Sequence, residues 1–200
     1  MLKILPYPAA ARDIELVFVG QRWTPEWDAR LLTHLVRQVP GDILEIGCNN
    51  GTTTFELASQ FPGRQVIGVD WLPAVETMVA EQRYESPRAD FGRHAEDMPN
   101  VTLRHQDSKS LDYTKLGEVG VVFIDGDHSY PGVEMDTILA VEHLHKRGGQ
   151  GMIVWHDYNS THPDWIAVKT FVDKLAERYE IEVYEDSWLA VLRFPAVPTI

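Results

Sequence analysis

The sequence predicts an α/β fold in which helices cover both faces of an open, mostly parallel sheet. Short apolar runs alternate with stretches of helical periodicity, as is typical of βαβ units. The run Val119–Ile124 is almost entirely apolar, as expected for a strand buried on both faces of a parallel sheet. The last two strands are joined only by Glu185–Ser187. That connection is too short for a parallel crossover, so the sheet should end with an antiparallel strand.

The elements are assigned in order from apolar periodicity and flanking turn residues. A helix should begin at Thr24-Pro25, since Thr is a common N-cap and Pro suits the first helical position. The other expected strands are 42–46, 65–70, 101–105, 119–124, 152–155, 180–184 and 188–194, and the other helices are 52–60, 73–83, 130–145 and 164–178. The last helix should turn Trp165 and Phe171 into the core. Residues 84–100 lack periodicity and predict a loop.

Length and composition indicate one globular domain, with an N-terminal arm and helix (1–40) packing on a main unit (41–200). The formal net charge of −12 argues against a nucleic-acid surface, so no nucleic-acid partner is expected. Cys48 is the single cysteine, which excludes an internal disulfide and fits a reducing compartment. The chain has neither a signal-like apolar segment near its start nor an apolar run long enough for a membrane, so a cytoplasmic location is expected. The apolar stretch Ile14–Val19 would suit either the core or an interface strand of a homo-oligomer.

The loop Glu45–Thr54 follows the first strand of the main unit and opens a helix. Gly47 would permit a sharp exit from the strand, and Gly51 would allow the backbone to approach a ligand closely. Asn49 stands where a dinucleotide fingerprint has its second glycine, and a P-loop lysine is missing, so both of those sites are disfavoured. The loop therefore predicts a nucleotide-type cofactor of another kind.

The next two strands also end in polar residues. Asp70 could accept hydrogen bonds from two ribose hydroxyls, or it could merely cap the following helix. Trp71 could stack on an adenine ring or pack in the core or a lid. Asp107 and Ser108 follow the third strand, where adenine would lie, although Asp107 could also be a plain loop acid.

Together these residues resemble the class I S-adenosylmethionine-dependent methyltransferases. The stretch "EIGCNNG" (45–51) is similar to the family's E/D-x-G-x-G-x-G motif, with Asn49 in place of the middle glycine. The resemblance spans roughly residues 40 to 195. It implies S-adenosylmethionine as cofactor, bound by Glu45, Gly47, Asn49, Gly51, Asp70, Trp71, Asp107 and Ser108. It also implies a three-layer Rossmann-like sheet of seven strands in the order 3-2-1-4-5-7-6, with strand seven antiparallel.

Two charged clusters, "IDGDHSY" (124–130) and "WHDY" (155–158), follow the fourth and fifth strands. In the implied sheet order these strands are neighbours, so Asp125 and Asp157 should meet beside the cofactor. Two carboxylates in one partly desolvated site repel each other unless one is protonated or a cation joins them. A divalent metal is the simplest resolution, either Mg²⁺ or Mn²⁺, with His156 able to add a nitrogen ligand.

The same clusters resemble blocks of the metal-dependent O-methyltransferases, especially the macrocin/sugar O-methyltransferase group and its cephalosporin hydroxylase-type relatives. The blocks are "FIDGDHSYPGVEMD" (123–136) and "GGQGMIVWHDY" (148–158). The resemblance implies Asp125 and Asp157 as metal ligands, with His156 or Tyr158 at the remaining ligand position. Asp127 could instead cap a turn, and His128 could be a buried structural histidine.

The sequence thus predicts methyl transfer to the hydroxyl of a small-molecule acceptor, such as a sugar or another natural product. The metal would lower the pKa of the acceptor hydroxyl, and His128 or Asp125 would take its proton. One alternative is a methyltransferase without metal in which His128 is the sole base. Another is a non-catalytic adenosyl-cofactor-binding regulatory domain. A nicotinamide oxidoreductase is disfavoured by the glycine spacing.

Overall fold

The computed structural model describes residues 1–72, 90–146, 148 and 150–195. Within these residues one sheet contains eight strands in the order β1-β7-β8-β6-β5-β2-β3-β4. The strands are β1 (Leu2–Leu5), β2 (Asp42–Ile46), β3 (Val66–Asp70), β4 (Val101–His105), β5 (Val119–Ile124), β6 (Gly151–Trp155), β7 (Ile181–Tyr184) and β8 (Ala190–Phe194). Strand β8 runs antiparallel to both β6 and β7, and the other pairs are parallel.

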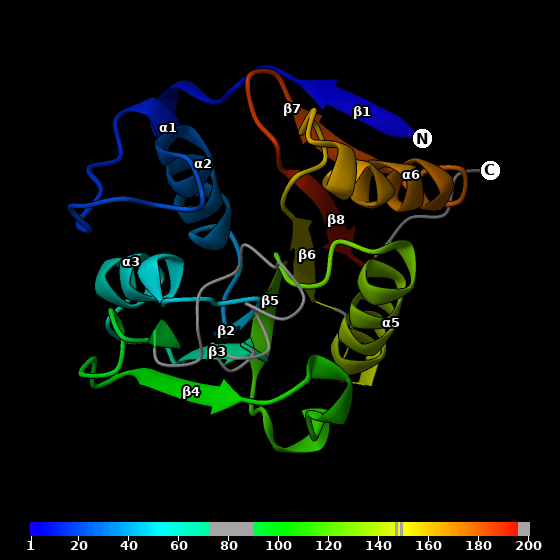
Figure 1. Ribbon diagram of the computed structural model, residues 1–200. Coiled ribbons are helices and arrows are strands. Elements are labelled where there is room, and N and C mark those ends of the chain that lie inside the picture. The colour runs from blue at the N-terminus through cyan, green and yellow to red at the C-terminus, as the bar shows by residue number, and fades with distance from the viewer. Residues whose placement is uncertain (73–89, 147, 149, 196–200) are drawn as a thin grey trace.

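Helices cover both faces of the sheet, which confirms the predicted α/β class (Figure 1). The α-helices are α1 (Ala9–Arg12), α2 (Glu26–Val36), α3 (Thr52–Gln60), α5 (Tyr130–Lys146) and α6 (Ile166–Leu175). Short 3₁₀ helices lie at η2 (Ser108–Ser110), η3 (Tyr113–Lys115) and η4 (Pro163–Trp165). In the described part of the chain, none of the helices is both long enough and apolar enough to cross a membrane.

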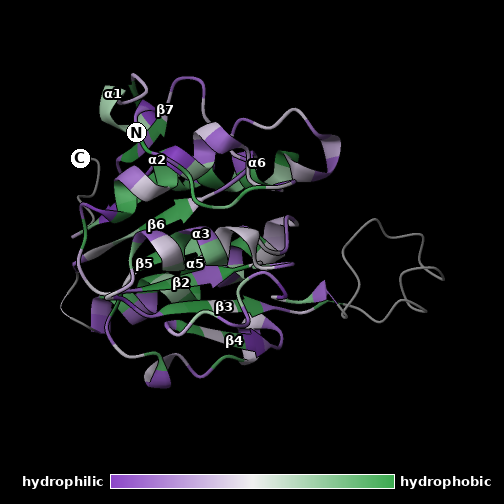
Figure 2. Cartoon of the chain, turned by 90° about the vertical axis from the view of Figure 1, so that its left-hand side faces the viewer, coloured by the Kyte–Doolittle hydropathy of each residue, from purple (hydrophilic) through white to green (hydrophobic). Residues whose placement is uncertain are grey.

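The sheet divides the hydrophobic core into two layers. Helices α2 and α3 pack on one face, where Leu31 and Leu57 meet alternate residues of β2 and β5. Helices α5 and α6 pack on the other face, where Val133 and Phe171 belong to the second buried cluster, which includes the remaining alternate residues of the strands. Figure 2 shows hydrophobic colour concentrated along the strands and on the helix faces that meet them. Burial on both faces explains why the central strands are continuous apolar runs.

The predicted strand order is correct, but the predicted number of strands is wrong. Seven of the strands follow the expected order, and β1 adds an eighth at the edge beside β7, with Leu2 opposite Ile181. The segment Leu2–Leu5 has only four residues, and the helix that follows it, α1, has only four as well, so neither gives a clear periodic signal. Its strand state depends on hydrogen bonds to a partner about 180 residues away, which local sequence patterns do not show.

The N-terminal region differs from prediction in two further details. Pro25, rather than Thr24, occupies the N-cap of α2. The Thr24 hydroxyl is buried and lies 3.0 Å from the hydroxyl of Thr53 on α3. The apolar stretch Ile14–Val19 forms no strand; Ile14 is buried, whereas Val19 is exposed. The expected helix 73–83 lies outside the described residues, and so do residues 84–89 of the expected loop 84–100.

The order of strands creates one position where ligands bind in such sheets. From β2 the chain builds outward through β3 and β4 on one side, and through β5 and β6 on the other. The carboxyl ends of β2 and β5 therefore flank a topological switch point, where the loops diverge and leave a crevice. The loops after β2, β3, β5 and β6 surround this crevice.

Candidate active site

The register of β5 and β6 brings the two charged clusters together. Ile124 and Trp155 form the last pair of the parallel β5–β6 ladder. Asp125 and His156 are therefore the first residues after the two strands end. The backbone N–H of His156 donates to the carbonyl of Ile124, which continues the ladder by one step. Asp157 then adopts φ +60°, a left-handed conformation that Asp tolerates better than most residues.

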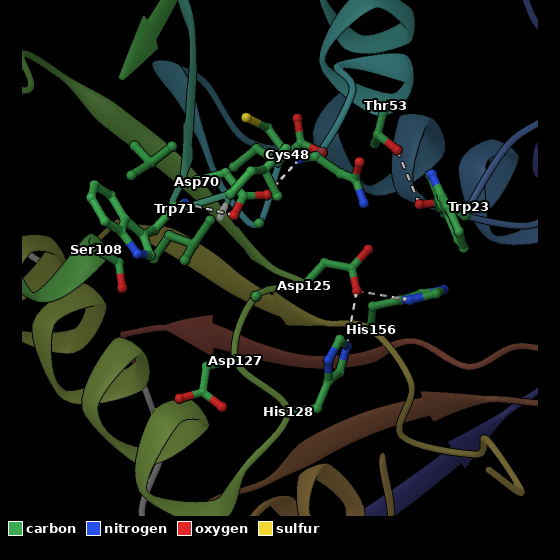
Figure 3. Close-up of a pocket in the computed structure, with 18 of the residues that line it drawn as sticks. Trp23, Cys48, Thr53, Asp70, Trp71, Ser108, Asp125, Asp127, His128 and His156 are labelled. Carbon is green, nitrogen blue, oxygen red and sulfur yellow. Dashed lines mark hydrogen bonds and ion pairs between the residues drawn. The ribbon is translucent and has the colours of Figure 1, made fainter. Parts of the chain in front are cut away.

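Asp125, His128, His156 and Asp157 form a compact cluster, in which the labelled side chains point toward one another (Figure 3). Asp125 Oδ1 lies 3.2 Å from His156 Nδ1 and 3.5 Å from His128 Nε2. Asp157 Oδ2 lies 3.3 Å from His156 Nδ1 and 2.9 Å from His128 Nε2. Each imidazole thus contacts both carboxylates. One ligand atom each from Asp125, His128 and Asp157 lie within 4.8 Å of one another, a spacing suited to a single metal ion.

The electrostatics of this cluster are those of tightly paired acids and bases. Burial alone would raise the pKa of Asp125 and Asp157, but the neighbouring histidines outweigh that effect and lower the pKa of both. Burial alone would lower the pKa of His128, but hydrogen bonds to the two carboxylates raise it to about 9. The pKa of His156 is raised well above its ordinary value by the same carboxylates. Without another cation, both imidazoles therefore carry the positive charge that balances the acids.

The loop after β2 lies against this cluster because of its glycines. Gly47 has φ +91°, and a Cβ at that position would lie 2.1 Å from the backbone oxygen of Asp125. Gly51 has φ +83° and is the N-cap of α3, where a Cβ would come within 2.9 Å of the carbonyl oxygen of Gly92. Both positions require glycine for conformation and for space. The loop can therefore approach both Asp125 and the pocket closely.

Asn49 and Asp70 connect the loops after β2 and β3. Asn49 also has a positive φ, of 46°, and its backbone N–H donates to Asp70 Oδ2 over 2.6 Å. Asp70 Oδ1 accepts from the backbone N–H of Trp71. A carboxylate oxygen can accept more than one hydrogen bond, and Asp70 lines the pocket. The side-chain oxygen Asn49 Oδ1 is buried and has no hydrogen-bond partner among the described residues.

Glu45, the next-to-last residue of β2, is a deeply buried acid. It is 1% exposed, and Thr54 on α3 donates a 2.5 Å hydrogen bond to it. Burial, together with the charges of Asp125 and Asp70, raises the pKa of Glu45 to about 8. The side chain is therefore largely protonated at neutral pH. A cationic ligand nearby would favour its ionised form.

The residues predicted near an adenine ring lie at the other end of the same pocket. Asp107 caps η2 by accepting from the backbone N–H of Lys109, a structural role that was not predicted for it. Ser108 donates to Asp136 on α5 over 2.6 Å, and burial raises the pKa of Asp136 to about 6. Trp71 is 61% exposed, so it is not a core residue. Its ring lies 5.2 Å from that of His105.

A single pocket of about 390 Å³ joins these groups, and all of the sequence-predicted site residues except Gly51 line it. Its acidic lining residues are Glu45, Asp70, Asp107, Asp125, Asp127 and Asp157, and no Lys or Arg lines it within the described part of the chain. Such a pocket favours cationic ligands and disfavours anionic ones. Trp23, Trp165 and Trp188 add large aromatic surfaces to the wall.

Comparison with known families decides the class of protein. Residues 44–158, more than half of the chain, match the model of a family described as "Methyltransferase domain". The chain belongs to this methyltransferase family. It is a class I S-adenosylmethionine-dependent methyltransferase, as the "EIGCNNG" loop predicted, and not a nicotinamide oxidoreductase. A search of the curated proteins found no match.

Solved structures with the same fold include several methyltransferases. The SAH-bound methyltransferase PaMTH1 of Podospora anserina aligns with a TM-score of 0.59 at 15% identity, over 86% of this chain and 79% of that one. A Staphylococcus aureus structure named as a caffeoyl-CoA O-methyltransferase aligns with a TM-score of 0.56 at 15% identity, over 90% of this chain and 85% of that one. The Methanococcus jannaschii fibrillarin pre-rRNA processing protein aligns with a TM-score of 0.52 at 16% identity, over 92% of this chain and 84% of that one. Likeness at this level of identity describes the fold of the methyltransferase.

Asp28 is a site residue of the methyltransferase that sequence reasoning missed. It lies on α2, is fully buried, and places Oδ2 3.4 Å from His156 Nε2. A signal was present in the sequence: Asp28 stands three, four and seven residues before Leu31, Leu32 and Leu35, the apolar face of the helix. An acid on the buried face of a helix needs polar partners, and one of the partners of Asp28 proves to be His156 of the candidate site.

Two aromatic side chains, Trp165 and Tyr158, differ from their predicted roles in this methyltransferase, and Trp188 contacts the site without having been predicted to. Trp165, predicted to lie in the core, belongs to η4 just before α6 and is partly exposed, with its ring 5.5 Å from that of His128. Tyr158, the alternative ligand, is buried and donates to Asp173 on α6, and it does not line the pocket. Trp188 precedes β8 and lies 6.0 Å from His156. Cys48 is buried, as its small apolar character suggests.

Proposed function

We propose that this methyltransferase transfers the methyl group of S-adenosylmethionine to a hydroxyl oxygen of a small-molecule acceptor with the help of a divalent metal. The observation that carries the proposal is the convergence of Asp125 and Asp157 on Nδ1 of His156, at 3.2 Å and 3.3 Å, beside the Gly47 loop. Mg²⁺ and Mn²⁺ suit a site rich in carboxylate oxygens, and an imidazole nitrogen shifts the preference toward Mn²⁺.

The residues present fit a metal ion. Asp157 Oδ1 is buried and has no hydrogen-bond partner among the described residues, so the carboxylate retains a free acceptor. Asp125, Asp157 and His156 would hold the metal, with Nδ1 of His156 facing both carboxylates. When bound, a divalent cation would lower the pKa of an adjacent acceptor hydroxyl and neutralise the two acids.

The residues present also fit the cofactor. The acidic lining of the pocket suits a sulfonium and an amino group, and Asn49 Oδ1 is a buried acceptor in need of a donor. Asp70 lines the pocket with a carboxylate, the kind of acceptor that ribose hydroxyls require, and Trp71 exposes a face on which a base could stack. The structural likenesses support this cofactor through the fold that they share with the chain.

With a metal neutralising Asp125 and Asp157, His128 would lose the proton that these acids hold on it, and it would then accept the proton of the acceptor hydroxyl. It is the more accessible of the two histidines, with 28% of its side chain exposed against 5% for His156. Methyl transfer makes an oxygen–carbon bond and breaks a sulfur–carbon bond, and the hydroxyl proton passes to Nε2 of His128. Trp165 packs on the His128 ring and, with Trp23 and Trp188, would shield the acceptor from water and orient it.

The acceptor would be a small neutral or cationic hydroxyl compound, such as a sugar or another natural product. The pocket is of small-molecule size, and it has no basic lining residue in the described part of the chain to receive an anionic group. The net charge of −12 remains an argument against a nucleic-acid substrate.

The test compares methyl transfer by purified protein before and after chelator treatment, followed by Mn²⁺ or Mg²⁺ addition. Activity should vanish with the chelator and return with the metal. Asp125→Asn should reduce turnover by at least about a hundredfold while the affinity for S-adenosylhomocysteine, measured by calorimetry, stays within a few fold. Asp112→Asn, at a carboxylate outside the pocket, is the control. Full activity in excess chelator would reject the metal and favour the alternative in which His128 acts without one.

A further inference from the structure

Asp28 uses its two carboxylate oxygens for two different tasks. Oδ1 accepts a 2.5 Å hydrogen bond from the Ser187 hydroxyl and a 3.1 Å hydrogen bond from the backbone N–H of Trp188. These bonds tie helix α2 to the segment between β7 and β8. Oδ2 lies 3.4 Å from His156 Nε2 and accepts no hydrogen bond from the described residues. The carboxylate is fully buried, so His156 is its counterpart on that side.

His156 in turn lies between Asp28 and the active-site carboxylates. Its Nε2 faces Asp28, and its Nδ1 lies 3.2 Å from Asp125 and 3.3 Å from Asp157. The ring is almost completely buried, and its centroid lies 6.2 Å from that of Phe123 and 6.0 Å from that of Trp188. The imidazole therefore connects helix α2 to the cluster through its two nitrogens.

We propose that Asp28 is a positioning residue that orients His156 and selects its tautomer for metal binding. This inference rests on the proposed function. A carboxylate accepts hydrogen bonds and cannot donate them, so Asp28 holds the proton of a neutral imidazole on Nε2. The lone pair is then on Nδ1, which faces the two acids that would bind the metal. A carboxylate behind a metal-binding histidine commonly fixes the tautomer and ring orientation in this way.

A purely structural role for Asp28 makes a different prediction. If Asp28 served only to hold the segment between β7 and β8, then Oδ1 would carry its whole effect. Removing either partner of that hydrogen bond would lower stability, and neither change would alter metal affinity selectively. The arrangement of the two oxygens allows these roles to be separated by substitution.

Asp28→Asn is the decisive variant because asparagine has nearly the same shape. Its side-chain oxygen can keep the hydrogen bonds from Ser187 and Trp188, while its NH₂ group then faces His156. An NH₂ group donates, so it favours the tautomer with the proton on Nδ1 and takes the lone pair away from the cluster. Ser187→Ala is the matched control, since it removes a partner of Oδ1 and leaves the His156 contact in place.

The experiment titrates Mn²⁺ into full-length wild type, Asp28→Asn and Ser187→Ala by calorimetry, with S-adenosylhomocysteine affinity and Tm measured in parallel. We expect Asp28→Asn to weaken Mn²⁺ binding by about 10- to 100-fold and to change S-adenosylhomocysteine affinity less than twofold. Ser187→Ala should lower Tm while its Mn²⁺ affinity stays within about twofold of wild type. Nitrogen-15 NMR of the wild type with diamagnetic Mg²⁺ should show His156 protonated on Nε2.

The outcomes separate this inference from the proposed function. If Asp28→Asn binds Mn²⁺ as tightly as wild type does, the positioning role is overturned, whereas the metal site itself still stands. A wild type that binds no Mn²⁺ would overturn both. If Asp28→Asn fails to fold, the NMR measurement on the wild type decides, and protonation of His156 on Nδ1 with Mg²⁺ bound would overturn the inference.

Discussion

The Nε2 atom of His128 lies 2.9 Å from Oδ2 of Asp157, although the two residues follow different strands. This contact places an accessible imidazole beside the carboxylates that would bind the metal, and it leads to the first prediction. His128→Ala should lower kcat by about 10²- to 10⁴-fold, because the acceptor hydroxyl loses its base. Mn²⁺ affinity should change only a few fold. Steady-state kinetics and calorimetry check this, with His145→Ala, outside the pocket, as control. A parallel loss of Mn²⁺ affinity would instead make His128 a metal ligand.

Glu45 should make stability depend on pH in a direction unusual for a carboxylate. Its pKa in the folded protein is about 8, above its ordinary value of 4.5, so the folded state binds the proton more tightly. This contribution to stability is complete below pH 4.5 and is lost as the pH rises toward 8. Glu45→Gln keeps an acceptor for Thr54 and does not titrate. We therefore compare the unfolding free energy of Glu45→Gln with that of wild type at two pH values. The difference, variant minus wild type, should be larger at pH 9 than at pH 5 by at least about 1 kcal/mol. Equal differences in unfolding free energy at both pH values would contradict the prediction.

Gly47 should be irreplaceable for reasons of space and backbone conformation. In Gly47→Ala the new Cβ would lie 2.1 Å from the backbone oxygen of Asp125, at φ +91°. We expect a loss of at least about 2 kcal/mol in urea unfolding, since neither backbone can yield cheaply. Gly63→Ala is the control, because no atom lies within 4 Å of its Cβ position, and it should change stability by less than about 0.5 kcal/mol. Similar effects of the two substitutions would show that the loop relaxes freely.

Glu56 on α3 should hold the N-terminal arm against the body of the protein. It accepts hydrogen bonds from the backbone of Val17 and Phe18 and pairs with Arg22 at 3.1 Å, with both side chains buried. Glu56→Gln would leave Arg22 buried without its counter-charge, at a cost of about 3–5 kcal/mol. Limited proteolysis within residues 17–22 should also become faster.

The surface pair Lys3–Glu180 provides the comparison for Glu56. Its side chains are about half exposed, at 48% and 45%, and their atoms are 3.3 Å apart. Glu180→Gln should therefore cost less than about 1 kcal/mol and leave the arm as resistant to protease as in wild type. Comparable losses for the two variants would contradict a special role for Glu56.

Local patterns predicted most of the fold because the central strands and the helices on them carry their own signal. Val119–Ile124 is buried on both faces and so is apolar throughout, and the described helices after it begin and end within a few residues of their predicted bounds. Strand β1 went unpredicted, since an edge strand of four residues depends on its partner β7 for its hydrogen bonds. Trp165 was misplaced because the chain forms η4 before α6 begins, which takes the residue off the apolar face of the helix.

The sequence by itself determined the α/β class, the loop of the methyltransferase family and the presence of acids at the ends of two strands. These features depend on short-range periodicity and on residues close together in the chain. Only the tertiary structure decided that Asp28 on α2 lies behind His156, that His128 contacts Asp157, and that Trp165 lines the pocket. Those contacts join segments far apart in sequence, and their geometry follows from strand register and helix packing, which no local pattern specifies.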